Sequence, residues 1–326
     1  MRRPNFSILT SRIPPRRFVL TLVLLAVAAF CVVNAHIPFS LALDPFALWH
    51  GDGPRLVLAN ERMNKYLLAH RYVPRNFDGV LIGPSLSANF DTRKIAARRI
   101  YNLSVNGGNA TELRHIFTPA AASGRLKYMI ISLDPYILAS QGFKDSTLNW
   151  VRPWEAALLS MPSRWAVVRA LHLRPMEDIF EDSPAGWNNF DLRKPRDLSR
   201  FNDAALNRPI SPDEIGRVPI SVMPGAMQDL KAMVALAHAK GIKVFAYYFP
   251  YDAIKFEIEL SHGWHDFRAT VETAFGPGDV VWDMNTSTYD YIRRRGESYT
   301  DGHLSQSGTA LVLADIQRRL DAQLPQ

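Results

Sequence analysis

Short apolar runs alternate with longer amphipathic segments through much of the chain, which predicts strands alternating with helices. The apolar runs, each short enough for one buried strand, occupy residues 78–83, 99–105, 126–133, 242–249 and 279–282. Helices are expected between them at residues 91–99, 110–122 and 225–240, the last ending before Gly241. Strands that alternate with helices predict a mostly parallel sheet covered on both faces, which is a three-layer α/β/α domain.

The alternating pattern breaks down between residues 139 and 220. Prolines interrupt this stretch repeatedly, at Pro153, Pro162, Pro175, Pro184, Pro195, Pro209 and Pro212. We interpret it as a long insertion carrying one or two helices, such as residues 154–173. Segments of this kind usually cap a site or bind a partner, although a surface excursion without function is the alternative.

The N-terminal region contains one apolar run that is much longer than the predicted strands. Residues 18–35 form a stretch of 18 residues without a charge, long enough to cross a bilayer as one helix. Five arginines precede it, which predicts a cytoplasmic basic tail at 1–17 and an exported C-terminal part. A cleaved signal peptide ending near Ala35 is the alternative. Residues 36–54 then form a linker, and the folded domain extends over 55–326.

The composition of the chain argues against nucleic-acid binding, disulfide bonds and metal sites. The formal net charge is +7, of which the five N-terminal arginines supply 5, so the remaining 7 − 5 = +2 argues against nucleic-acid binding. Cys31 is the one cysteine, so neither an intrachain disulfide nor a cysteine-ligated metal is possible. His262 and His265 lack a third ligand and are expected at the start of a helix. We therefore expect no metal and no cofactor.

Two short polar motifs carry the candidate chemistry. Ser85 follows Gly83-Pro84 at a strand-to-helix turn, where a side chain is exposed to substrate and the backbone N–H can face an oxyanion. Near the C-terminus, Asp301 lies two residues before His303. His303 could serve as general base to Ser85, with Asp301 orienting it, as in a serine triad. The alternatives are a helix cap at Ser85 and an ordinary turn at 301–303.

These motifs resemble those of the SGNH, or GDSL-like, hydrolase superfamily. The blocks that carry the resemblance are Ile82-Gly83-Pro84-Ser85, residues 101–109 (YNLSVNGGN), residues 131–134 (ISLD) and Asp301-Gly302-His303. The resemblance implies a flavodoxin-like fold with Ser85 as nucleophile and an Asp301-His303 pair. It looks closest to the membrane-anchored, exported branch that includes proteins of polysaccharide and teichoic-acid modification.

The chain departs from the family pattern in three places. Pro84 stands where aspartate is usual, one residue rather than two separates Asp301 from His303, and Asp134 lies in the block that normally reads Gly-x-Asn-Asp. An ionised Asp134 cannot donate a hydrogen bond. The oxyanion hole would then need the backbone N–H of Ser85 or donors from the segment after the second strand. The candidates there are Gly107, Gly108, Asn106 and Asn109, and a tight turn is the alternative role of the glycine pair.

The sequence thus predicts an exported serine esterase or O-acyltransferase, held in the inner membrane by one helix with a periplasmic domain. Its expected partners, implied by the resemblance and the topology, are an acetylated surface polysaccharide and a membrane-bound acyl donor protein. A non-catalytic polysaccharide-binding or assembly protein is the first alternative, favoured by the altered asparagine block. A lipase or thioesterase, with residues 139–220 as a lid, is the second.

Overall fold

A single parallel sheet forms the centre of the protein. The structure is a computed structural model, and it describes residues 15–50, 60–144, 148–149, 152–171, 185–188, 219–293, 298–299 and 303–324. Within these ranges five strands pair in the order β2-β1-β3-β4-β5, and every pairing is parallel. The strands are β1 (Gly79–Ile82), β2 (Ile100–Asn102), β3 (Tyr128–Leu133), β4 (Lys243–Tyr248) and β5 (Val280–Asp283). Each overlaps a predicted apolar run, so the predicted parallel sheet is confirmed.

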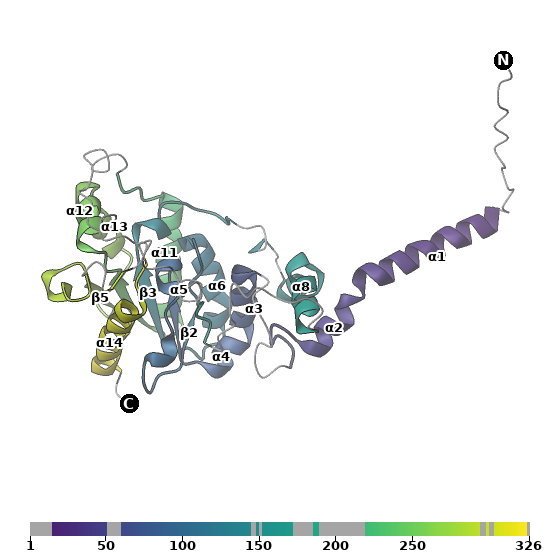
Figure 1. The fold of residues 1–326 in the computed structure, drawn as a ribbon, viewed down its shortest axis with the longest axis horizontal. Coiled ribbons are helices and arrows are strands. Elements are labelled where there is room, and N and C mark those ends of the chain that lie inside the picture. Colours follow the sequence, from purple (N-terminus) through teal and green to yellow (C-terminus); the bar gives the residue numbers. More distant parts are fainter. Residues whose placement is uncertain are drawn as a thin grey trace, which may run out of the picture.

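Helices cover both faces of this sheet (Figure 1). They are α3 (Glu61–His70), α4 (Tyr72–Asn76), α6 (Ala110–Ala122), α11 (Pro224–Ala239), α12 (Ala253–Ser261), α13 (Trp264–Glu272) and α14 (Gln306–Gln323). Helix α6 packs against α3 and α11, whereas α14 contacts the 3-10 turn η1 (Thr92–Lys94) that lies between β1 and β2. The two groups lie on opposite sides of the strands, so the three-layer α/β/α prediction is confirmed.

The strand order reverses at β1, which lies between β2 and β3. The chain leaves β1 toward β2 and then crosses back to β3 on the other side. In doubly wound sheets of this order, ligands bind at such a switch point, beyond the carboxyl ends of the strands. The segments that follow β1, β2 and β3 are therefore the ones that the fold brings to one place.

The prediction of a helix over residues 91–99 is wrong. Only the single turn η1 forms there, and Ala97 adopts a left-handed conformation with φ of 58°. Gln317 of α14 accepts a hydrogen bond from Ala96 N (2.7 Å) and donates one to Ala96 O (3.0 Å). Contacts with a helix more than 200 residues away thus satisfy this backbone, which local sequence could not indicate.

The apolar N-terminal segment is a long exposed helix. α1 spans Pro15–Asn34, and α2 follows at His36–Leu43. Together Arg16–Leu43 form the one described segment that is long and apolar enough to cross a membrane. Helix α2 differs from the expected linker, because its Ser40 donates to Ala157 O (3.1 Å) and Asp44 accepts from the backbone of Leu48 to His50.

The insertion begins with two helices, as predicted, but divided at Ser160. α7 spans Pro153–Leu159, and α8 spans Met161–Ala170. Pro162 lacks an N–H and its ring would clash with the carbonyl of residue 158 in a continuous helix, which accounts for the division. Both helices pack against α2, and α7 also contacts α3. The residues at 172–184 and 189–218 lie outside the described part of the chain.

Two histidines lie where α3 packs on α6. The ring of Tyr66 meets His70 edge-on at 4.9 Å and stacks on His115 at 4.5 Å. Burial, with a smaller contribution from His115, lowers the pKa of His70 from 6.5 to about 4. Between these pH values the unfolded chain binds a proton at His70 that the folded protein does not, so falling pH destabilises the fold.

We therefore expect a His70→Phe variant to lose less stability than the wild type between pH 7 and pH 5. Phenylalanine keeps the edge contact with Tyr66 and removes the titrating group. Urea unfolding of both proteins at each pH measures the difference. Parallel stability losses in the two proteins would contradict the expectation.

Candidate active site

Ser85 lies at the switch point, on the tight turn that follows β1. It is the first residue of the short helix α5 (Ser85–Ala88), and its side chain is partly exposed. A Cβ on Gly83 would lie 2.3 Å from Ser87 Oγ and 2.7 Å from the Cβ of Ser132 on β3, so only glycine fits there. As the first residue of the helix, Ser85 has a backbone N–H that no intrahelical carbonyl accepts.

His303 comes from the other end of the chain and meets Ser85. Its Nε2 lies 3.2 Å from Ser85 Oγ, within hydrogen-bond reach. An antiparallel bridge between Tyr299 and Leu304 and a 2.7 Å bond from Ser305 N to Ser298 O hold the segment around it. Ser305 then caps α14 by accepting from Gly308 N. The structure thus brings together two residues 218 positions apart, whereas Asp301 lies outside the described residues.

The predicted oxyanion candidates lie on the loop between β2 and α6, and most of them have other partners. Asn109 is the N-cap of α6: its Oδ1 accepts from Glu112 N (3.1 Å) and its Nδ2 donates to Gly142 O (2.9 Å). The backbone N–H of Gly108 donates to Val105 O at 3.0 Å. The backbone N–H of Asn106 donates to Glu61 Oε2 at 2.8 Å.

The side chain of Asn106 stays a candidate: its Oδ1 accepts from Asn188 Nδ2 at 3.5 Å, and its Nδ2 is the group that could donate. Gly107 is another candidate on this loop. Its φ of 62° is left-handed, a conformation that favours glycine. Its carbonyl accepts from Lys144 Nζ at 3.0 Å, and within the described part of the chain no group accepts from its N–H. The backbone N–H groups of Gly107 and Ser85 thus have no acceptor within the described residues, and their role as oxyanion donors stays a prediction.

Asp134, at the carboxyl end of β3, has a structural environment. The carboxylate is buried, accepts from Tyr136 N at 2.7 Å, and is bonded to the hydroxyl of Tyr251. Burial raises the pKa of Asp134 to about 6, and the bonds from Tyr251 and Tyr136 oppose that rise. Because both oxygens already accept hydrogen bonds, this residue does not replace the asparagine donor of the family pattern.

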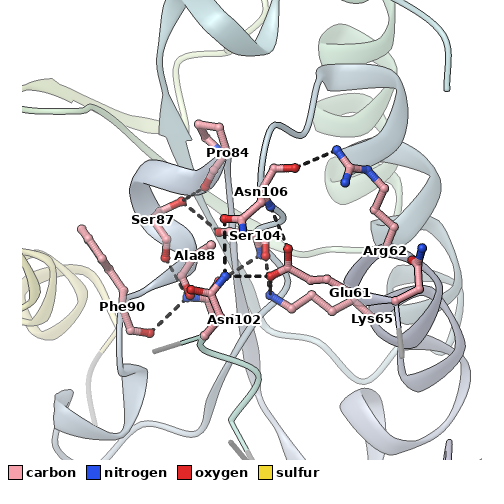
Figure 2. Close-up of polar contacts among 12 residues, drawn as sticks. Glu61, Arg62, Lys65, Pro84, Ser87, Ala88, Phe90, Asn102, Ser104 and Asn106 are labelled. Carbon is pink, nitrogen blue, oxygen red and sulfur yellow. Dashed lines mark hydrogen bonds and ion pairs between the residues drawn. The ribbon is translucent and has the colours of Figure 1, made fainter. Parts of the chain in front are cut away.

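Several residues that hold the site together were not predicted. Asn102 Nδ2 donates to the carbonyls of Ser87 (2.7 Å) and Phe90 (3.0 Å), and its Oδ1 accepts from Ser104 N (2.9 Å). Ser87 Oγ in turn donates to Ser104 Oγ at 2.9 Å. Figure 2 shows how these contacts join the helix that carries Ser85 to the loop after β2. The signal available in the sequence was an asparagine within a predicted buried strand, because a buried amide needs hydrogen-bond partners and so indicates a structural contact.

Charged residues of α3 approach the same loop from the opposite side (Figure 2). Lys65 Nζ donates to Ser104 O, Glu61 accepts from Asn106 N, and Arg62 Nη2 donates to Asn106 O at 2.7 Å. Lys65 and Glu61 also form an ion pair at 3.2 Å, and both are buried. Sequence offers no signal for this network, because its partners lie about 40 residues apart in the chain.

The remaining chemical candidates lie elsewhere. His265 lies in the first turn of α13, as expected, whereas His262 is the C-cap at the end of α12. The described residues contain no group of three or more His, Cys, Asp or Glu side chains arranged to hold a metal ion. Trp154 is exposed on α7, Trp187 is partly exposed with Arg93 over its ring at 5.7 Å, and Trp150 lies outside the described residues.

No protein-family model matches the sequence, and no curated protein matches it. Among solved structures, it is similar to a protein from Streptococcus pneumonia described as a candidate platelet activating factor. That match has a TM-score of 0.42 and 11% identity, and it covers 79% of this chain and 91% of the other. A GDSL-like lipase from Bacteroides thetaiotaomicron matches with a TM-score of 0.39 and 11% identity, covering 82% and 99%. The geometry of the site is therefore argued from this chain's own contacts.

Proposed function

We propose that this protein is an SGNH-like serine hydrolase or O-acyltransferase with Ser85 as its nucleophile. The observation that supports this most strongly is the 3.2 Å separation of Ser85 Oγ and His303 Nε2 at the switch point of the sheet. A serine hydroxyl becomes an effective nucleophile when an imidazole accepts its proton at this distance. Asp301 would orient His303 and stabilise the imidazolium, the role of the acid in serine triads.

The reaction proceeds in two halves. Ser85 Oγ attacks the acyl carbonyl carbon while its proton passes to His303 Nε2, and the oxyanion accepts hydrogen bonds from the N–H groups of Ser85 and Gly107. Collapse of this intermediate breaks the bond to the alcohol, which takes the proton from His303. Water or a sugar hydroxyl then attacks the acyl-serine and gives its proton to His303. The second intermediate collapses by breaking the bond to Ser85 Oγ, which takes that proton back from His303. Water yields hydrolysis, and a sugar hydroxyl yields transfer.

The proposed substrate is an O-acetyl group of a cell-surface polysaccharide. The apolar helix ending at Leu43 could hold the domain at a membrane, and the N-terminal arginines favour an exported domain. This gives an inner-membrane protein with a periplasmic domain, near polymer and near a membrane-bound acyl donor. The exposed ring of Trp154 could stack on a sugar. A sugar ring presents an apolar face that suits such a surface.

Acyl-chain profiling tests this proposal. The full-length protein in detergent micelles is assayed with p-nitrophenyl esters from acetate to dodecanoate, and with acetylated polysaccharide by acetate release. We expect the highest kcat/KM with acetate and measurable acetate release. A maximum at eight carbons or more would favour the lipase or thioesterase alternative, and we would abandon the acetyl assignment.

A non-catalytic binding or assembly role is the second candidate, and one observation favours it. Asp134 cannot supply the oxyanion donor of the family pattern, because its carboxylate already accepts from Tyr136 and Tyr251. Loss of one oxyanion donor costs about 10²–10³ in rate. If no ester is turned over and Ser85→Ala leaves function in cells unchanged, this second candidate replaces the first.

A further inference from the structure

The buried ion pair of Lys65 with Glu61, together with the neighbouring Arg62, bonds to the backbone of the loop between β2 and α6. From this contact we propose that Glu61 and Lys65 are positioning residues, which hold the N–H of Gly107 where it can receive the oxyanion. The inference rests on the proposed function.

The contacts of α3 are made to the backbone of the loop. Lys65 Nζ donates to the carbonyl of Ser104, Glu61 Oε2 accepts from the N–H of Asn106, and Arg62 Nη2 donates to the carbonyl of Asn106. These groups flank the peptide that leads into Gly107. Because this peptide is planar and trans, the carbonyl of Asn106 and the N–H of Gly107 point in opposite directions, so bonds that fix Asn106 also fix the direction of the Gly107 N–H.

The far end of the loop is held by the same helix. Arg62 Nε donates to Glu112 Oε1 at 3.0 Å, and the side chain of Glu112 is fully buried in the first turn of α6. Asn109 caps that turn and is itself fully buried. Gly107 therefore lies between two segments that hydrogen bonds hold in place, Asn106 on one side and the first turn of α6 on the other. Its left-handed conformation forms the turn between them.

The network also reaches the helix that carries the nucleophile. Lys65 donates to the carbonyl of Ser104, and the hydroxyl of Ser104 accepts from Ser87 Oγ. Ser87 is two residues after Ser85 on α5. The contact between Ser87 and Ser104 thus joins α5 to the loop that carries Gly107 (Figure 2). Movement of the loop would change the oxyanion geometry without removing any reacting group.

A buried ion pair is weak evidence for stability, because desolvation offsets the attraction between its charges. Lys65 is 1% exposed and Glu61 is 8% exposed. An apolar pair could fill the same space, but it could not bind the carbonyl of Ser104 or the N–H of Asn106. The polar contacts to the loop are therefore what these two charges contribute to the site.

Steady-state kinetics of two variants of the full-length protein test the inference. Lys65→Met removes the hydrogen bond to the carbonyl of Ser104. We expect kcat for p-nitrophenyl acetate to fall about 100-fold, since a displacement of a catalytic group by about 1 Å costs this much. KM should stay within about twofold. The double variant Glu61→Gln/Lys65→Met leaves no unpaired buried charge and keeps an acceptor for Asn106 N, so it should fold even where the single variant does not. For it we expect a fall of about tenfold or more.

An alkyl boronic acid, which forms a tetrahedral adduct with the serine, supplies the second readout. Its affinity should weaken by the same factor as kcat, because both depend on the oxyanion donors. Lys127→Met is the matched control: Lys127 pairs with Asp78 at 3.5 Å, is 72% exposed, and lies at the opposite end of β3. The control should match the wild type in both measurements.

The outcomes separate this inference from the proposed function. Wild-type turnover with an unchanged kcat in either folded variant would overturn the positioning role and leave the function standing. A decrease in kcat that equals the unfolded fraction, with unchanged boronate affinity, would also overturn it. Absence of turnover in the wild type would overturn the proposed function and the positioning role together.

Discussion

Replacing Ser85 with alanine is expected to lower ester hydrolysis by at least about a thousandfold while leaving the fold intact. The acyl-serine cannot form without the Oγ, and the remaining oxyanion donors supply only a part of the rate. The side chain is partly exposed, so its removal should change the free energy of unfolding by less than about 0.5 kcal/mol. Initial rates with p-nitrophenyl acetate, beside a urea unfolding curve, measure both effects.

His303 supplies a sharper form of the same prediction. Because Ser85 Oγ and His303 Nε2 are 3.2 Å apart and act as one unit, the Ser85→Ala/His303→Ala double variant should be no slower than either single variant. Ser261→Ala is the matched control and should retain full activity, because Ser261 is exposed and its hydroxyl donates to Ile258 O of its own helix. Additive losses in the double variant would show that the two residues act separately.

Replacing Asn102 with alanine is expected to have the largest effect on stability, a loss of about 3 kcal/mol. The carbonyls of Ser87 and Phe90 and the N–H of Ser104 would each lose a partner in a buried setting. Each unsatisfied buried group costs about 1–3 kcal/mol, part of which relaxation recovers. Activity should also fall, since α5 would no longer be fixed to β2.

Urea unfolding measures this loss. Asn76→Ala is the matched control: its Nδ2 donates to Tyr72 O at 2.9 Å at a partly exposed helix end, and its loss should cost about 1 kcal/mol or less. If Asn102→Ala and Asn76→Ala lose the same stability, the amide of Asn102 does not hold the site as we describe.

The sequence predicted the sheet well because a parallel strand is buried on both faces. β1 and β3 are buried along their whole length, so each reads as a continuous apolar run that periodicity detects. The bounds of α6 also match the prediction, since Asn109 and the apolar face of the helix are local signals. In contrast, residues 91–99 are shaped by Gln317 of α14, a contact that local sequence does not carry.

In the candidate site, too, residues with a local sequence signal were predicted, and residues defined by distant contacts were not. Ser85 and His303 were selected as chemical residue types near strand ends, and the switch at β1 accounts for their meeting. Asn109 was taken as an oxyanion candidate, although an asparagine directly before a helix is a favoured N-cap, and capping is its observed contact. The roles of Glu61 and Lys65 could not be predicted, because their contacts join segments that are distant in sequence.

Covalent labelling of Ser85 is the most direct test of the central claim that this residue is an activated nucleophile. The full-length protein in detergent micelles is treated with a fluorophosphonate, digested, and mapped by mass spectrometry. We expect one adduct, on Ser85, with labelling at least about 100-fold slower in His303→Ala because the base is gone. No adduct at Ser85 in the wild type, or equal labelling rates with and without His303, would contradict the account.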